Sequence, residues 1–148
     1  LPFGIHSSLT AGIPSARMIT ANTEARNTNG ETITDNISVG YNATPGSNNI
    51  PFGIVIDGCS DGYSDLTFVP GTNRDFNVTV CLLGTAIVEV EPGQILPTAS
   101  VPSFNPANGR LVAAGFAGAV TAPGWMTVSG STGTGTAQNP EYAVVLVR

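Results

Sequence analysis

DFNVTVCLLGTAIVEVEPGQIL, residues 75–96, is the stretch that decides the fold. It contains two mostly apolar runs separated by Gly84, and apolar and polar side chains alternate along both runs. Such alternation is typical of strands, because successive side chains of a strand point to opposite faces. Pro92 cannot donate a hydrogen bond to a strand ladder, so Pro92-Gly93 ends the second run. The pattern predicts a core hairpin with a tight bend at Gly84.

The composition of the whole chain favours strands over helices. The chain has 148 residues, with 18 Gly, 11 Pro and only 10% charged side chains, which is the length of one domain and the composition of a turn-rich protein. We therefore predict an all-β fold, a small β-barrel or β-sandwich, in which residues 15–148 form a single β domain. No apolar run has the length of a membrane span, so we expect no membrane partner.

Two segments that flank the central stretch resemble one another. Residues 51–69 and 122–147 each begin with a Pro and a Gly, continue with a short apolar run and a Gly- and Ser-containing loop, and end in a second β run. The spacing of roughly 70 residues exceeds the 20–50-residue periods of solenoids and propellers. It predicts an internal duplication of a half-barrel or sheet, and coincidence among Gly-rich strands is the alternative.

Residues 1–14 differ from the rest of the chain. Pro and Gly recur at short intervals there, and the apolar side chains stand alone. This pattern predicts an extended N-terminal arm that docks its apolar residues either on a neighbouring molecule or on its own domain, because a terminal segment is ordered only when it is tied down. The arm residues predicted to bind a partner are Leu1, Pro2, Phe3, Ile5 and Leu9.

Trp125 is the sixth candidate for partner binding, and it is the only tryptophan of the chain. A large aromatic residue at the start of a strand is explained either as part of the core or as an anchor in an interface. Both roles are kept open for Trp125.

No catalytic constellation is recognisable in the sequence. The sole histidine, His6, lies in the arm, and no serine stands in a nucleophile motif. Glu89 and Glu91 project to the same side of a predicted strand, as a carboxylate pair for glycoside hydrolysis would, but a solvated strand end explains them better. We expect no enzyme and no cofactor.

Metal and disulfide sites are weakly indicated. Asp57, Asp61 and Asp65 gather in a Gly-rich loop, but their spacing does not match a known calcium loop and is better explained by tight turns. Cys59 and Cys81 are the only cysteines, and we expect them to be reduced and buried.

The charge distribution argues against a nucleic-acid partner. The net charge is −5 at pH 7, and the five basic residues are widely spaced arginines. A nucleic-acid surface needs clustered cations, because binding is driven by the release of counterions from phosphates.

The order of motifs resembles the small head-decoration, or cement, proteins of tailed bacteriophages. The resemblance is carried by FGIVIDGCSDG, VEVEPGQILPTAS, NGRLVAA, GWMTVSGSTG and the terminal YAVVLV, and it covers residues 51–148. It implies a β-barrel or β-sandwich that binds the outer surface of the capsid, commonly as a homotrimer, with the major capsid protein as its partner and the arm adding contacts. The expected location is the virion, after synthesis in the host cytoplasm.

Two other classes remain as alternatives. A carbohydrate-binding or adhesive β-sandwich of a head fibre, tail or cell surface would need exposed aromatic residues on one face, whereas the chain has one Trp and three Tyr scattered along it. A jelly-roll coat protein of an RNA virus normally needs a basic arm, and residues 1–14 carry no Lys or Arg.

Overall fold

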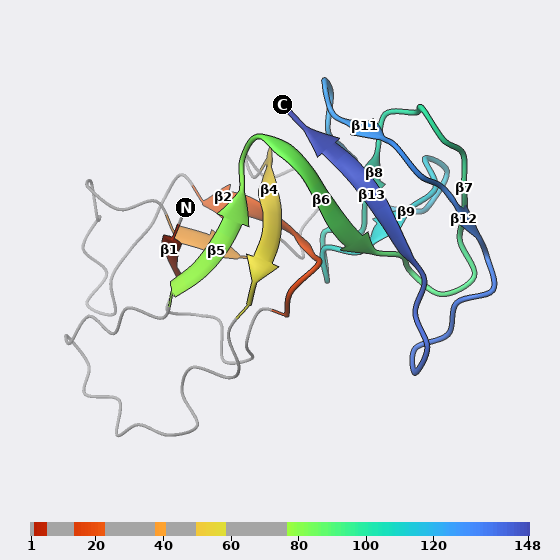
Figure 1. Ribbon diagram of the computed structural model, residues 1–148, viewed down its shortest axis with the longest axis horizontal. Helices are drawn as coiled ribbons and strands as arrows, with labels where there is room; N and C mark the ends of the chain where they lie inside the picture. The colour runs from red at the N-terminus through yellow and green to blue at the C-terminus, as the bar shows by residue number, and fades with distance from the viewer. Residues whose placement is uncertain (1, 6–13, 23–37, 41–49, 59–76) are drawn as a thin grey trace.

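The computed structural model describes residues 2–5, 14–22, 38–40, 50–58 and 77–148. Within these ranges the chain forms strands and turns and no helix, so the predicted all-β class is confirmed (Figure 1). The strands are β1 (Pro2–Ile5), β2 (Met18–Asn22), β3 (Ser38–Gly40), β4 (Ile50–Asp57), β5 (Asn77–Cys81), β6 (Gly84–Glu89), β7 (Ile95–Leu96), β8 (Ser103–Phe104), β9 (Leu111–Val112), β10 (Val120–Thr121), β11 (Met126–Thr127), β12 (Ser131–Thr132) and β13 (Tyr142–Val147).

The first five strands form one sheet, in the order β1-β3-β2-β4-β5. β1 also pairs with β5, so the order of pairing returns to its first strand. β1 runs parallel to β3, and the other pairs are antiparallel. The group occupies one side of the molecule in Figure 1.

β1 lies inside the predicted N-terminal arm. Its residues Pro2, Phe3 and Ile5 belong to a strand that is paired on both edges with strands of the same chain. Of the two docking alternatives, the structure therefore places this part of the arm on its own domain. Leu1 and Leu9 lie outside the described residues.

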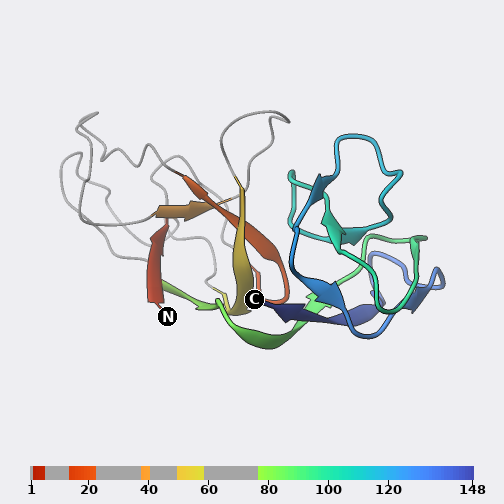
Figure 2. The ribbon, with the colours of Figure 1, turned by 90° about the horizontal axis from the view of Figure 1, so that it is seen from above.

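The remaining strands form a second group, seen beside the first in Figures 1 and 2. Its largest sheet has the order β11-β13-β6, and two smaller sheets have the orders β10-β8-β9 and β12-β7. β13 is the central strand, and its side chains at Ala143, Val145 and Val147 are buried. The near-continuous apolar run at residues 142–147 predicts a strand buried on both faces. The strand is present between two neighbours, but its burial alternates, so only one face is buried against the core.

The predicted core hairpin is wrong, although both of its strands exist. β5 pairs with β1 and β4, whereas β6 pairs with β13, so the chain leaves one sheet at Cys81 and enters another at Gly84. Gly84 has φ of 110°, a conformation that side chains disfavour, and it permits the sharp change of direction. The bend at Gly84 was correctly located, but it joins two sheets.

Asn108-Gly109 before an apolar run also favours a hairpin with a primed two-residue turn, but the structure has a longer connection there. β8 and β9 do form an antiparallel hairpin, but their connection spans residues 105–110, with Asn105 N–H donating to Arg110 O at 2.8 Å. A type I′ turn needs positive φ at both central residues, and only Gly109, at 73°, has it.

The two segments of the predicted duplication are arranged differently. β4, in the first segment, is paired along both edges by β2 and β5. β11, at the corresponding place in the second segment, has two residues and lies at the edge of its sheet. The second β run of the first segment, residues 63–69, lies outside the described residues.

One hydrophobic core serves both groups of strands. A single cluster contains Met18 and Ile54 from the first group together with Val88, Phe104 and Trp125 from the second. Trp125 is 7% exposed, and its ring meets the Phe104 ring edge to face, with centroids 5.8 Å apart and planes at 77°. The ring of Trp125 is therefore covered by its own chain and packs in the core, and the partner-binding role of Trp125 stays a prediction.

Candidate functional site

Residues 16–18 connect the two groups of strands, and we call them the bridging segment. On one side it bonds to β4: Ala16 N–H donates to Val55 O, and Val55 N–H donates to Arg17 O, both at 2.8 Å. Ala16 has φ of 62°, in the left-handed region that costs a non-glycine residue about 1 kcal/mol or more. The surrounding hydrogen bonds hold this residue in place.

On its other side the bridging segment bonds to the second group. Glu89 N–H donates to Ala16 O, and Met18 N–H donates to Gly109 O, both at 2.8 Å. The backbone of three consecutive residues is thus shared between β4, the end of β6 and the β8–β9 connection.

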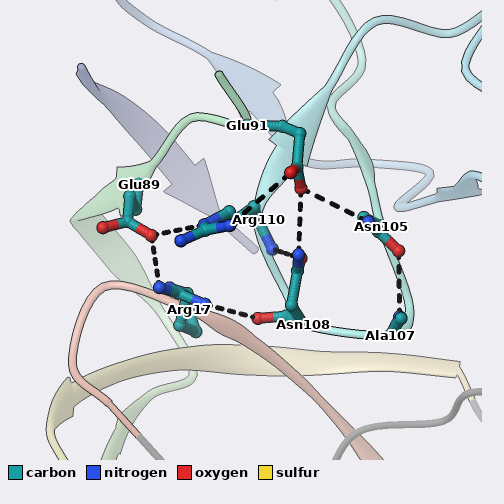
Figure 3. A network of polar contacts seen from close by, with 7 residues as sticks. All are labelled: Arg17, Glu89, Glu91, Asn105, Ala107, Asn108 and Arg110. Atoms are coloured by element: carbon teal, nitrogen blue, oxygen red, sulfur yellow. Dashed lines mark hydrogen bonds and ion pairs between the residues drawn. The ribbon is translucent and has the colours of Figure 1, made fainter. Parts of the chain in front are cut away.

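A buried ion-pair network lies over the same junction, as Figure 3 shows. Glu89 Oε2 pairs with the guanidinium of Arg17 and accepts a hydrogen bond from Nε of Arg110 at 2.6 Å. The side chains of Arg17 and Glu89 are 12% and 11% exposed. The hydrogen bond from Arg110 to the Glu89 carboxylate raises the pKa of the Arg110 guanidinium above its ordinary value, so Arg110 stays charged.

Glu91 extends the network to the β8–β9 connection. Its Oε1 pairs with Arg110 Nη1 at 3.5 Å, and its Oε2 accepts hydrogen bonds from the side-chain amides of Asn105 at 3.3 Å and Asn108 at 3.0 Å. Arg17 Nη1 donates to the backbone carbonyl of Asn108 at 3.0 Å. Two carboxylates, two guanidiniums and two amides are thus linked in one network, in which Arg17 Nε is buried without a hydrogen-bond partner (Figure 3).

The interpretation of Glu89 and Glu91 as a solvated strand end is wrong. The two carboxylates do share one side of the chain, as predicted, but Arg17 and Arg110 cover them. No direct signal for this pairing is visible in the sequence, because the cations come from segments far away in the chain. Because guanidinium groups bind both carboxylates, the Glu89 and Glu91 side chains link separate elements of the fold.

A second polar cluster fixes the loop that follows β12. The Glu141 carboxylate accepts hydrogen bonds from the backbone N–H groups of Thr132 and Gly133, both at 3.0 Å, and from the hydroxyl of Thr132 at 2.7 Å. These hydrogen bonds, the hydroxyl of Thr132 foremost, lower the pKa of Glu141 from 4.5 to about 2. The loop is thus held by a carboxylate that stays ionised in mild acid.

An apolar groove opens between β4 and β6, beside the bridging segment. Its volume is ≈ 480 Å³. It is lined by Ser15, Ala16, Val55, Ile56, Thr85, Ala86, Ile87 and Val144. Two of these side chains are large, apolar and largely solvent-exposed: Ile56 at 57% and Ile87 at 58%. The sequence analysis did not single out this surface, and its only signal was the placement of Ile87 on the face of the strand opposite to Val88.

Of the remaining candidate metal-binding, disulfide and catalytic residues, some lie within the described residues and others outside them. Asp57 lies at the end of β4 and is exposed, and Cys81 is a buried free thiol whose sulfur lies 3.5 Å from Leu83 O. Among the described residues no group of His, Cys, Asp or Glu could hold a metal ion. The candidates that lie outside the described residues are His6, Cys59, Asp61 and Asp65.

No family model matches the chain, and no curated protein is significantly similar in sequence. In the ranges that the structure describes, no helix is long and apolar enough to cross a membrane.

Replacing Glu89 by Gln should destabilise the fold strongly. The substitution removes the anion that faces both Arg17 and Arg110, and the loss of one partner of a buried ion pair typically costs about 3–5 kcal/mol. Urea unfolding of the wild type and Glu89→Gln measures the difference in free energy of unfolding. Glu91→Gln is the matched control: Gln keeps an acceptor for the amides, so its loss should be smaller. Equal losses for the two variants would contradict the central place of Glu89.

The Glu141 carboxylate should remain ionised well below pH 4.5. Because its folded pKa is lowered to about 2, its stabilising contacts are fully present above the unfolded value of 4.5 and are lost as pH falls through about 2. The amide resonances of Gly133 and Gly135 report this in NMR spectra, and they should show no titration between about pH 6 and pH 3. A midpoint near 4.5 that Glu141→Gln abolishes would contradict the prediction.

Proposed function

We propose that the chain is a structural virion protein that binds the outer surface of a tailed-phage capsid and stabilises it, as a decoration or cement protein. The observation that carries the proposal is the apolar groove between β4 and β6. Its large exposed apolar side chains are Ile56 and Ile87. Single exposed apolar residues are ordinary, but Ile56 and Ile87 share one groove, and contiguous apolar surface marks a site of protein association.

The charge pattern supports a protein partner as well. Within the described residues, Glu89 and Glu91 are neutralised by Arg17 and Arg110, and Glu141 is occupied by its own loop. In the described ranges, Asp57 and Arg148 are the charged residues classed as exposed, so this part of the surface carries few charges. Many copies of such a surface on a capsid lattice reinforce one another, because symmetric repetition converts weak contacts into strong overall binding. The proposed partners are the major capsid protein and two further copies of the chain in a homotrimer.

The alternative of a carbohydrate-binding module receives less support. Sugar binding relies on exposed aromatic rings, and Trp125 is buried against Phe104. Tyr142 is the one aromatic side chain among the exposed large hydrophobic residues of the described chain. A face with a cluster of exposed rings is therefore missing from these residues.

A binding experiment tests the proposal. Capsids of the encoding phage, prepared without the chain, are mixed with purified full-length protein and sedimented. We expect saturable co-sedimentation and a higher temperature of capsid disruption, because a ligand that binds only the assembled state stabilises it. Absence of co-sedimentation, together with binding on a glycan array, would replace the proposal by the carbohydrate-binding alternative.

A further inference from the structure

The edge of β6 that lines the groove is unpaired in the described part of the chain. β6 pairs with β13 alone and lies at the end of its sheet. Val90 N–H donates to Glu141 O at 2.9 Å, in line with the β6–β13 register. Hydrogen-bonded and non-hydrogen-bonded pairs alternate in an antiparallel ladder, so Val88 and Ala86 also bond toward β13.

The backbones of Thr85 and Ile87 therefore face away from β13. The neighbouring Glu89 shows this direction directly, because its N–H leaves the sheet and bonds to Ala16 O at 2.8 Å. Two and four residues further back along β6, at Ile87 and Thr85, the N–H and C=O groups point along the same edge, where the groove lies. An open edge of this kind is complementary to an extended strand.

Proteins normally protect such edges. Lysine, proline, a bulge or a covering element prevents edge-to-edge association. β6 reads GTAIVE and has no lysine or proline, and its register with β13 is continuous from Gly84 to Glu89. Ile87 adds a large exposed apolar side chain to the same edge. An edge with these properties is expected to be covered by a partner in the functional state of the protein.

The acidic charge of the chain indicates which kind of partner would bind the β6 edge. Asp57 is exposed and directly follows Ile56, which lines the groove, but Asp57 is not itself a lining residue. It precedes Gly58, whose N–H bonds to Ser15 Oγ at 3.0 Å. The chain carries 10 acidic and 5 basic residues. Pairing with a second copy would bring two acidic chains together, whereas a strand with a Lys or Arg near Asp57 gains an attraction.

We propose that the β6 edge binds an extended segment of the major capsid protein by strand addition, with a basic residue of that segment near Asp57. The identity of this partner rests on the proposed function. The segment would exchange hydrogen bonds with the backbones of Thr85 and Ile87, and its apolar side chains would lie on Ile56 and Ile87.

Two variants at Ile87 test the proposal on full-length protein. Ile87→Pro removes one edge N–H that does not take part in the ladder with β13, and Ile87→Lys keeps this N–H but places a cation over the apolar groove. Ile95→Lys is the matched control, because Ile95 is 69% exposed and lies on β7, away from the groove. Thermal unfolding should be similar for all four proteins, since exposed positions contribute little to stability.

Binding to capsids of the encoding phage is then measured by titration and sedimentation. We expect Ile87→Pro and Ile87→Lys to bind at least about tenfold more weakly than the wild type and Ile95→Lys to bind normally. Hydrogen exchange should show protection of the Thr85 and Ile87 amides only on capsids. Wild-type binding with unchanged binding of both Ile87 variants would overturn the inference and leave the proposed function intact. A wild type that fails to sediment with capsids overturns both, and protection of these amides in a free dimer would assign the edge to a second copy.

Discussion

The contact of Glu89 with Arg17 and Arg110 is the interaction on which the arrangement of the two groups of strands depends. Arg17 enters from the first group and Arg110 from the second, and one carboxylate neutralises both. Burying charges away from water costs several kcal/mol per ion unless they are paired and hydrogen-bonded. Separation of the groups would leave these charges with fewer partners, so the network specifies one relative placement.

The same junction explains why an edge of β6 remains open. Ala16 satisfies the N–H of Glu89 at the end of β6, but the bridging segment then turns away into β2 with Met18. The left-handed φ of Ala16 makes this turn. The preceding edge positions, Thr85 and Ile87, are left facing the groove. The path of one backbone segment thus explains both features: how the two groups of strands are connected, and why the candidate docking surface is open.

Local patterns in the sequence were sufficient for the class of the fold and for several of its strands. The alternation along residues 77–90 and the apolar run at 142–147 each became strands, because period-two patterns reflect burial of one face. Pairing was not predictable in the same way. A tight bend at Gly84 predicts a hairpin by default, and only the long-range pairing of β6 with β13 decides otherwise. The network around Glu89 was missed for the same reason, since Arg17 and Arg110 have no local relation to it.

Scanning calorimetry of the full-length protein tests most directly whether the two groups of strands form one cooperative unit. Because they share a core cluster, the bridging segment and the Glu89 network, we predict one unfolding transition in which the calorimetric and van't Hoff enthalpies agree. Two separate transitions, or a calorimetric enthalpy well above the van't Hoff value, would show that the groups unfold independently and would contradict this structural account.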